Sequence, residues 1–229
     1  MRLDNVSKSF GELEVLRDVS FSVEEGEFVS LVGPSGAGKS TLFNIIAGLD
    51  TPTSGQLLID GSVAYMPQHD ALFPWRTIEQ NAALGLEVQG VGRRQAVARA
   101  RELFGEFGLA GFEQAYPFEL SGGMRQRAAL LRTVVQGKDM LLLDEPFGAL
   151  DSLTRRGMQE WLKGMWAKHN WTALLITHDV REAIELSDRI VVLSPRPATV
   201  RAEFAVGGDP LALEREVLQE LGDVPDLAP

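Results

Sequence analysis

The stretch of sequence that decides the fold reads Gly33-Pro34-Ser35-Gly36-Ala37-Gly38-Lys39-Ser40-Thr41. It fits the pattern GxxxxGK[ST], and it lies between a short apolar run, residues 29–32, and a helical pattern over about 39–48. Glycines let the backbone turn so that its N–H groups point at phosphate oxygens, and the helix N-terminus adds a positive dipole. We therefore expect this loop to hold the phosphate chain of a nucleoside triphosphate.

Three side chains of the loop have separate expected roles. Lys39 should reach the β- and γ-phosphates, the Ser40 hydroxyl should ligate magnesium, and Thr41 can add a hydrogen bond to phosphate. The alternative is a glycine-rich turn with an exposed lysine. The strand–loop–helix context argues against that alternative.

Polar residues follow two other predicted strands, at ends where parallel sheets bind ligands. The apolar run 140–143 leads into Asp144 and Glu145. Because successive strand residues point to opposite faces, the two carboxylates should diverge: Asp144 toward magnesium, and Glu145 toward an attacking water as general base. The run 173–176 leads to His178, which either contacts the γ-phosphate or that water, or is structural.

The rest of the chain predicts an α/β fold. Strands are expected over about 2–9, 19–23 and 27–32, and a hairpin joins 57–59 to 63–65 at Asp60-Gly61. Residues 77–136 have a helical pattern, and the last third alternates strand and helix, which favours a parallel sheet covered on both faces. We expect one domain with an α/β core over about 1–76 and 137–205, a helical subdomain over about 77–136, and a short tail over about 206–229 with one helix near 211–221.

Composition excludes several classes of protein. The formal net charge is −10, which argues against a nucleic-acid partner. There are no cysteines, so disulfides and thiolate zinc sites are excluded. The N-terminus has no apolar segment typical of a signal peptide, and no apolar run approaches the length that spans a bilayer. We expect a chain that does not cross a membrane by itself.

A second candidate anion site begins at Ser121, within the sequence Leu120 to Arg127. Ser121 should cap a helix whose first turn carries Gly122 and Gly123. The chain has only one phosphate loop. We therefore expect this second element to serve a nucleotide held by another copy, in a head-to-tail dimer with two composite sites.

Taken together, these segments resemble the ATP-binding subunit of an ABC transporter over about residues 1–205. The resemblance implies a P-loop NTPase (RecA-like) core with a small antiparallel β region and an inserted helical subdomain. The segment 120–127 resembles the family signature, and Asp144-Glu145 the Walker B end. The stretch between Thr53 and Gln68 is shorter than is usual in the family, so we expect a trimmed β region.

Four single residues take their expected roles from the same resemblance. Gln68 corresponds to the Q-loop glutamine, which senses magnesium and faces the membrane subunits, and His178 corresponds to the switch histidine. Asp151 belongs to a D-loop, and Phe10 lies where an aromatic ring stacks on adenine.

The implied mechanism uses ATP and Mg²⁺ and requires several partners. Two copies close on two ATP molecules, with each γ-phosphate held by Lys39 of one copy and by Ser121 and Gly123 of the other. Ser40, Gln68 and Asp144 would hold the metal. The implied partners are transmembrane permease subunits and a periplasmic or lipid-anchored substrate-binding protein. The implied location is peripheral, on the cytoplasmic face of the inner membrane.

Residues 73–77 and 146–155 resemble, more narrowly, bacterial importers of nitrate, sulfonates and taurine, or of thiamine precursors. Phe73 and Trp75 either form part of a groove for a membrane-subunit helix or pack against the helical insertion. The alternatives to transport are an ABC-type ATPase for cluster assembly or chromosome maintenance, and a small-molecule kinase.

Overall fold

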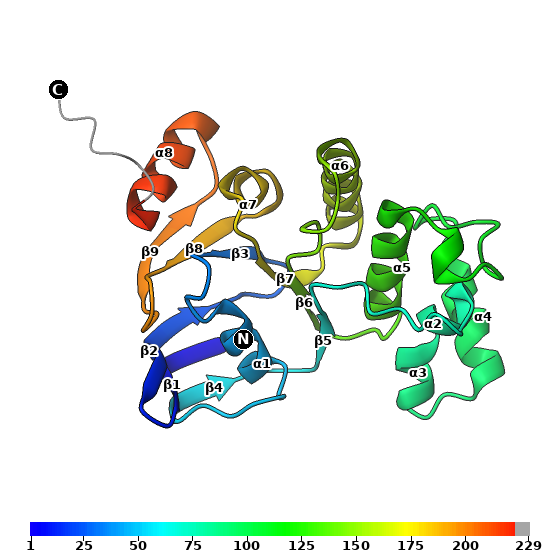
Figure 1. Ribbon diagram of the computed structural model, residues 1–229, viewed down its shortest axis with the longest axis horizontal. Helices are drawn as coiled ribbons and strands as arrows, with labels where there is room; N and C mark the ends of the chain where they lie inside the picture. Colours follow the sequence, from blue (N-terminus) through cyan, green and yellow to red (C-terminus); the bar gives the residue numbers. More distant parts are fainter. Residues whose placement is uncertain (223–229) are drawn as a thin grey trace.

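Two β-sheets of different kinds lie next to each other in the computed structural model, which describes residues 1–222 (Figure 1). The smaller sheet is antiparallel and has the order β2-β1-β4. Its strands are β1 (Arg2–Phe10), β2 (Leu13–Ser22) and β4 (Ser54–Leu58).

The larger sheet has six strands in the order β5-β6-β7-β3-β8-β9. All neighbouring strands in it are parallel except β9, which pairs antiparallel with β8. The strands are β3 (Phe28–Val32), β5 (Val63–Met66), β6 (Met140–Asp144), β7 (Thr172–Ile176), β8 (Arg189–Leu193) and β9 (Val200–Ala205). Strands β3 and β6 are buried at every residue, as expected for apolar runs in a parallel sheet covered on both faces.

Helices cover the larger sheet and also form a separate group at one end of the molecule (Figure 1). That group contains α2 (Ile78–Ala82), α3 (Leu84–Val88), α4 (Arg93–Phe104) and α5 (Gly122–Val134). The other helices are α1 (Lys39–Ile46), α6 (Ser152–His169), α7 (Val180–Leu186) and α8 (Pro210–Leu221). The α/β fold class predicted from the sequence is confirmed.

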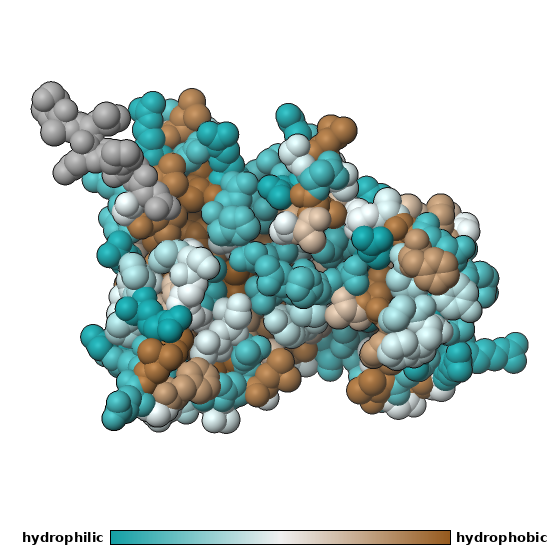
Figure 2. All heavy atoms as spheres, in the orientation of Figure 1, coloured by the Kyte–Doolittle hydropathy of each residue, from teal (hydrophilic) through white to brown (hydrophobic). Residues whose placement is uncertain are grey.

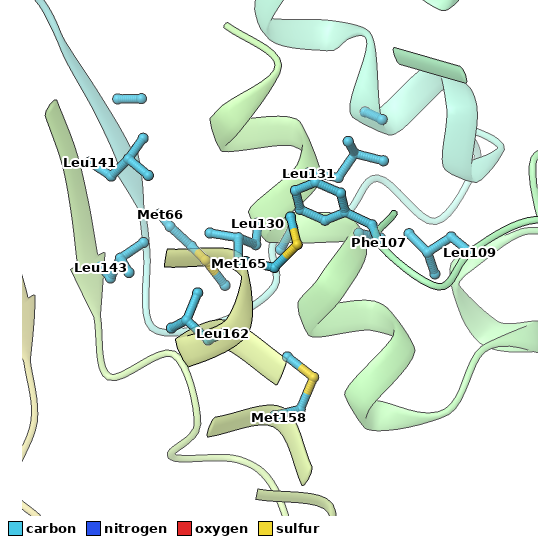
Figure 3. Packing of buried hydrophobic residues seen from close by; sticks show 14 of the residues in the cluster. Met66, Phe107, Leu109, Leu130, Leu131, Leu141, Leu143, Met158, Leu162 and Met165 are labelled. Carbon is cyan, nitrogen blue, oxygen red and sulfur yellow. The ribbon is translucent and has the colours of Figure 1, made fainter. Parts of the chain in front are cut away.

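The two faces of the larger sheet have separate hydrophobic cores. On one face, α1 packs between the two sheets through Phe43 and Ile46. On the other face, Met66 and Leu143 of the sheet lie near Leu130 of α5 and Leu162 of α6 (Figure 3). The helical group therefore shares a core with the sheet, which fixes where the N-terminus of α5 lies. The proposed division at residues 77 and 136 stays a prediction.

The predicted hairpin at Asp60-Gly61 is wrong. β4 pairs antiparallel with β1, whereas β5 pairs parallel with β6, so the turn carries the chain from one sheet to the other. Gly61 has φ +110°, and a Cβ there would lie 2.6 Å from the Asp139 carboxylate, which also accepts hydrogen bonds from Ser62. This contact with a residue far along the chain, rather than pairing between the two short strands, sets the register of β5.

Other sequence-based bounds differ less. The predicted strand 19–23 is the end of the longer β2. β9 was not predicted; in the structure its residues are alternately half-buried and exposed. Within the helical pattern predicted over 77–136, α4 ends at Phe104, and Phe107 is buried in the turn that follows. The predicted tail helix is confirmed as α8, and the part of the tail after 222 lies outside the described residues.

Within residues 1–222, no helix combines the length and the apolar character needed to span a bilayer. On the face drawn in Figure 2, hydrophobic residues lie in small groups among hydrophilic ones.

Candidate functional site

The loop between β3 and α1 has the backbone that a phosphate site needs. Gly36 and Gly38 have φ of +75° and +113°, a region that favours glycine. At Gly38, a Cβ would also lie 2.8 Å from a methyl carbon of Val15, so β2 excludes any side chain there. The loop therefore curls around the start of α1 in a way that only this glycine pattern permits.

Lys39 is the buried cation at the centre of this loop. Its ammonium donates hydrogen bonds to the carbonyl oxygens of Gly33 at 2.6 Å and Pro34 at 3.0 Å, and the residue is 7% exposed. Burial lowers the pKa of the Lys39 ammonium, and the nearby carboxylates of Glu145 and Asp144 oppose that shift. A desolvated cation above a cradle of backbone N–H groups fits a phosphate chain.

A pocket of about 600 Å³ opens in front of the loop and brings together residues that are far apart in sequence. Most of the predicted loop and catalytic residues line it, and Leu13, Val15 and Arg196 line it without having been predicted. The full lining is Leu13, Val15, Ser35, Gly36, Gly38, Lys39, Ser40, Thr41, Gln68, Glu145, His178 and Arg196. The alternation of apolar and polar residues in β2 could have suggested that Leu13 and Val15 share a face, but not which face.

Three of the predicted catalytic residues lie together in this pocket. Glu145 accepts a hydrogen bond from the Gln68 amide at 3.0 Å, and its carboxylate lies 3.4 Å from Nδ1 of His178. The three residues follow β5, β6 and β7, which are neighbours in the sheet. Because the carboxyl ends of parallel strands meet at one edge, the topology places these side chains together.

The two carboxylates at the end of β6 have different surroundings, for a reason other than the one expected. Glu145 lies after the strand with φ +43°, so this left-handed turn, and not strand alternation, sets its direction. Asp144 is buried and accepts a hydrogen bond from the Tyr65 hydroxyl at 3.1 Å. Burial raises the pKa of the Asp144 carboxyl, and the hydrogen bond from Tyr65 opposes that effect.

The predicted magnesium ligands form no complete metal cage. Among residues 1–222, no group of three or more His, Cys, Asp or Glu side chains could hold a metal ion. Magnesium usually binds through one or two carboxylates together with phosphate oxygens and water. Ser40 and Gln68 at the pocket and the buried Asp144 beside it fit that pattern, with the phosphates supplying further ligands.

Phe10 is placed at the edge of this site. It ends β1, is 52% exposed, and pairs across the small sheet with Leu13, which lines the pocket. The Lys8 ammonium lies 4.8 Å from the centre of its ring. Phe10 is therefore next to the pocket but not among its lining residues, and its contact with adenine stays a prediction.

The predicted residues of the signature segment lie away from the pocket of their own chain. Ser121 caps α5 by accepting a hydrogen bond from the Met124 N–H at 3.3 Å, and Asp151 caps α6 in the same way at 3.0 Å from the Thr154 N–H. Gly123 packs against α6, since a Cβ there would lie 2.9 Å from Thr154 Cγ2. None of Ser121, Gly122, Gly123 and Asp151 lines the described pocket.

The two aromatic residues after Gln68 differ in exposure. Trp75 is 70% exposed, and Phe73 is half-buried, with 5.1 Å between the centres of their rings. The Phe73 N–H donates to the Asn81 side chain at 2.7 Å, which ties Phe73 to α2. Trp75 therefore does not pack into the helical group.

Comparisons with known proteins agree with this geometry. Residues 16–148 match the family model described as ABC transporter. The formylaminopyrimidine import ATP-binding protein of Halalkalibacterium halodurans is 48% identical over 197 residues, which cover 85% of this chain and 79% of the relative. The nitrate import ATP-binding protein of Synechocystis sp. is 45% identical over 204 residues, covering 86% and 77%. The aliphatic sulfonates import ATP-binding protein of Bacillus cereus is 44% identical over 202 residues, covering 85% and 79%.

Solved structures give the same result. The dimeric structure of a bacterial ABC transporter cassette superposes with a TM-score of 0.78 at 32% identity, over 91% of this chain and 99% of that one. The same kind of cassette in a post-hydrolysis state, bound to ADP and phosphate, superposes with a TM-score of 0.77 at 32% identity. With a phosphate loop, a carboxylate–histidine cluster and these likenesses in the same chain, the protein belongs to the ABC transporter family of ATP-binding cassettes.

Proposed function

We propose that this chain binds and hydrolyses ATP to drive import of a small solute across a bacterial inner membrane, and that it works as a pair of identical copies. The observation that carries this proposal is the opening of the Gln68–Glu145–His178 cluster onto the same pocket as Lys39. A phosphate-binding loop and a base for water therefore face one space, which is what hydrolysis of a phosphate anhydride requires.

Binding is assigned to the loop. Its backbone N–H groups and the ammonium of Lys39 hold the phosphate chain, and the hydroxyl of Thr41 adds a hydrogen bond. Magnesium, when bound to the nucleotide, neutralises developing phosphate charge, and Ser40, Asp144 and Gln68 are the residues that would hold it. Phe10 stacks on adenine at the end of the pocket where Leu13 and Val15 form an apolar wall.

The chemistry is assigned to the cluster at the ends of β5, β6 and β7. Glu145 accepts the proton of a water that attacks the γ-phosphorus, and the bond to the oxygen bridging the β-phosphate breaks, giving ADP and inorganic phosphate. His178 orients the γ-phosphate, and Gln68, which donates to the Glu145 carboxylate, positions that base. The 3.4 Å between Glu145 and His178 lets both side chains face one reacting group.

The second copy completes each site. Ser121 and Gly123 of the partner close on the γ-phosphate held by Lys39, with Gly122 and Asp151 beside them. This assignment is supported by the position of Ser121, which is exposed at the N-terminus of α5 and does not line the pocket that contains Lys39 of its own chain. The solved cassette that superposes on this chain is dimeric, which supports the pairing of two copies.

The remaining partners are permease subunits and a substrate-binding protein. The relatives reported above are named as import proteins for formylaminopyrimidine, nitrate and aliphatic sulfonates, which favours import and leaves the non-transport alternatives unsupported. We place the chain peripherally on the cytoplasmic face of the inner membrane. The exposed ring of Trp75, a few residues after Gln68, is a candidate contact with the permease. The solute is a small anion or organic nutrient.

Replacement of Glu145 by Gln tests the proposed chemistry. The amide keeps the shape of the side chain but cannot accept the proton, so ATP turnover should fall by about 100-fold or more while ATP binding persists. Because ATP then stays intact, size-exclusion chromatography with ATP and Mg²⁺ should show more dimer. Glu160→Gln, at an exposed position on α6, is the matched control. Turnover of Glu145→Gln close to that of the unchanged protein would remove Glu145 from the proposed role.

A further inference from the structure

Arg196 is a cation at the pocket that neither the phosphate-loop motif nor the family resemblance accounts for. It lies in the loop between β8 and β9 and is among the residues that line the pocket. Its Nε and Nη2 atoms donate to the carbonyl oxygen of Gly36 at 3.1 and 2.7 Å. Arg196 thus touches the tip of the phosphate loop from outside the loop's own sequence.

The loop that carries Arg196 is held firmly against β2. The Ala198 N–H donates to the Val15 carbonyl at 2.9 Å, and the Arg17 N–H donates to the Ala198 carbonyl at 2.9 Å. Within the loop, the Ser194 N–H donates to the Thr199 carbonyl at 2.9 Å. Val15 lines the same pocket, so the hydrogen bonds that hold this loop also hold one wall of the site.

The order of strands gives Arg196 its side of the site. The phosphate loop follows β3, which lies between β7 and β8 in the sheet. His178 follows β7, with Glu145 and Gln68 beyond it after β6 and β5, whereas Arg196 follows β8 on the opposite side of β3. The side chains proposed to act on the γ-phosphate therefore come from one side of the loop, and Arg196 comes from the other side, together with Leu13 and Val15 of β2.

The charge of Arg196 is not neutralised within the part of the chain that the structure describes, where it forms hydrogen bonds to a backbone carbonyl and no ion pair. A guanidinium has further N–H donors beyond those used at Gly36, and their planar arrangement suits phosphate oxygens.

We propose that Arg196 is a nucleotide-binding residue: its guanidinium braces Gly36 and also contacts the part of the phosphate chain or ribose that ATP and ADP share. The inference rests on the proposed function, because it takes the pocket to hold a nucleotide. It assigns to this chain a second cation for the phosphates, contributed by the loop after β8. Unlike the γ-phosphate contacts, this one should survive hydrolysis and slow the loss of ADP.

The test is a calorimetric titration of the full chain, with Mg²⁺, using ADP and a non-hydrolysable ATP analogue. Arg196→Ala should lower the affinity for ADP and for the ATP analogue by the same factor, about 10-fold. The reason is the loss of a charge-assisted hydrogen bond to a group that both nucleotides share. Arg196→Gln should lose as much affinity, because its amide carries no charge. That amide can still donate to the Gly36 carbonyl, so this variant keeps the brace on the loop. Arg196→Lys should regain part of the affinity. Arg2→Ala, at the far end of β1, is the control for loss of an exposed positive charge.

Each contrary result has a distinct meaning. Affinity of Arg196→Gln equal to that of the unchanged protein would show that the side chain only braces the loop, and would overturn the proposal. A lower affinity for the ATP analogue but not for ADP would place Arg196 at the γ-phosphate and would also overturn the proposal. Failure of the unchanged protein to bind either nucleotide would instead reject the proposed function. Thermal unfolding of each variant shows whether the overall fold is retained.

Discussion

The phosphate loop and the segment from Ser121 to Gly123 have the same local chemistry and different surroundings. Both place glycines at the N-terminus of a helix, where backbone N–H groups favour an anion. In the loop, positive φ angles at Gly36 and Gly38 curl the chain around a buried Lys39, and a pocket opens in front.

At α5, by contrast, the glycines meet a packing requirement. A Cβ on Gly123 would lie 2.9 Å from Thr154, and one on Gly122 would lie 3.3 Å from Leu150. Ser121 is exposed and does not line the pocket that contains Lys39. Similar helix N-termini thus become a complete site or half of one according to which residues the tertiary structure places in front of them.

The largest effect is expected from a substitution in the phosphate loop. Lys39→Ala removes the buried ammonium that faces the phosphates, so affinity for ATP should fall by about 1000-fold, as is typical when one partner of a buried charge pair is lost. Fluorescence or calorimetric titration measures this directly. The control is Lys163→Ala, at an exposed position on α6. Binding within a few-fold of the unchanged protein would mean that the loop holds nucleotide without Lys39, and the contrast between the two regions would be lost.

Ser121→Asp tests the role of the segment from Ser121 to Gly123. Aspartate caps a helix as well as serine does, so α5 should stay folded, but its charge repels a phosphate brought by a second copy. Turnover should fall about 100-fold, as expected when transition-state contacts to phosphate are replaced by repulsion. ATP binding to the single chain should be unchanged. Ser121→Asn, a neutral cap, should retain much more activity, and equal activity of the two variants would argue that Ser121 serves only α5.

Mixing the two defective proteins shows whether the site is shared. A heterodimer of Lys39→Ala and Ser121→Asp has one site with an intact Lys39 from one copy and an intact Ser121 from the other. ATPase activity should therefore rise on mixing, well above the low activity of either variant alone. No recovery, with heterodimers demonstrated by cross-linking, would mean that each chain builds its site alone.

The smallest effect concerns how the free energy of unfolding depends on pH through Glu182, four residues after His178. Glu182 of α7 is 5% exposed and accepts a hydrogen bond from Gln159 at 3.1 Å. Burial raises the pKa of its carboxyl from the ordinary value of 4.5 to about 7. Between those two pH values the folded state binds more protons than the unfolded state, so stability falls as pH rises. From pH 5 to pH 7 the loss should be about 2 kcal/mol.

Glu182→Gln should abolish this part of the pH dependence, because the amide does not titrate and can still accept from Gln159. Urea unfolding at pH 5 and pH 7 measures the difference. Asp209→Asn, an exposed cap of α8, controls for loss of one carboxylate. A slope that persists in Glu182→Gln would assign the titration to another group.

Much of the fold and site was open to prediction because it depends on local pattern. The loop 33–41, the helix after it and the buried strand 140–144 each follow from neighbouring residues in the sequence. Ser121 as the cap of α5 follows in the same way, and the structure has that cap. The errors arose where distant residues compete: Asp60-Gly61 has the composition of a hairpin turn, but Asp139 holds Ser62 and directs the chain into the other sheet.

Sequence alone determined that this protein has one phosphate loop, a carboxylate pair after a buried strand and a second helix start rich in glycine, because each feature is a run of adjacent residues. The three-dimensional fold was needed to show that Gln68, Glu145 and His178 meet in one cluster, that Glu145 leaves its strand by a left-handed turn, and that Arg196 reaches Gly36. The physical reason is the order of strands in the sheet. Parallel neighbours bring their ends to one edge, and hydrogen bonds across that edge join residues whose spacing along the chain carries no such information.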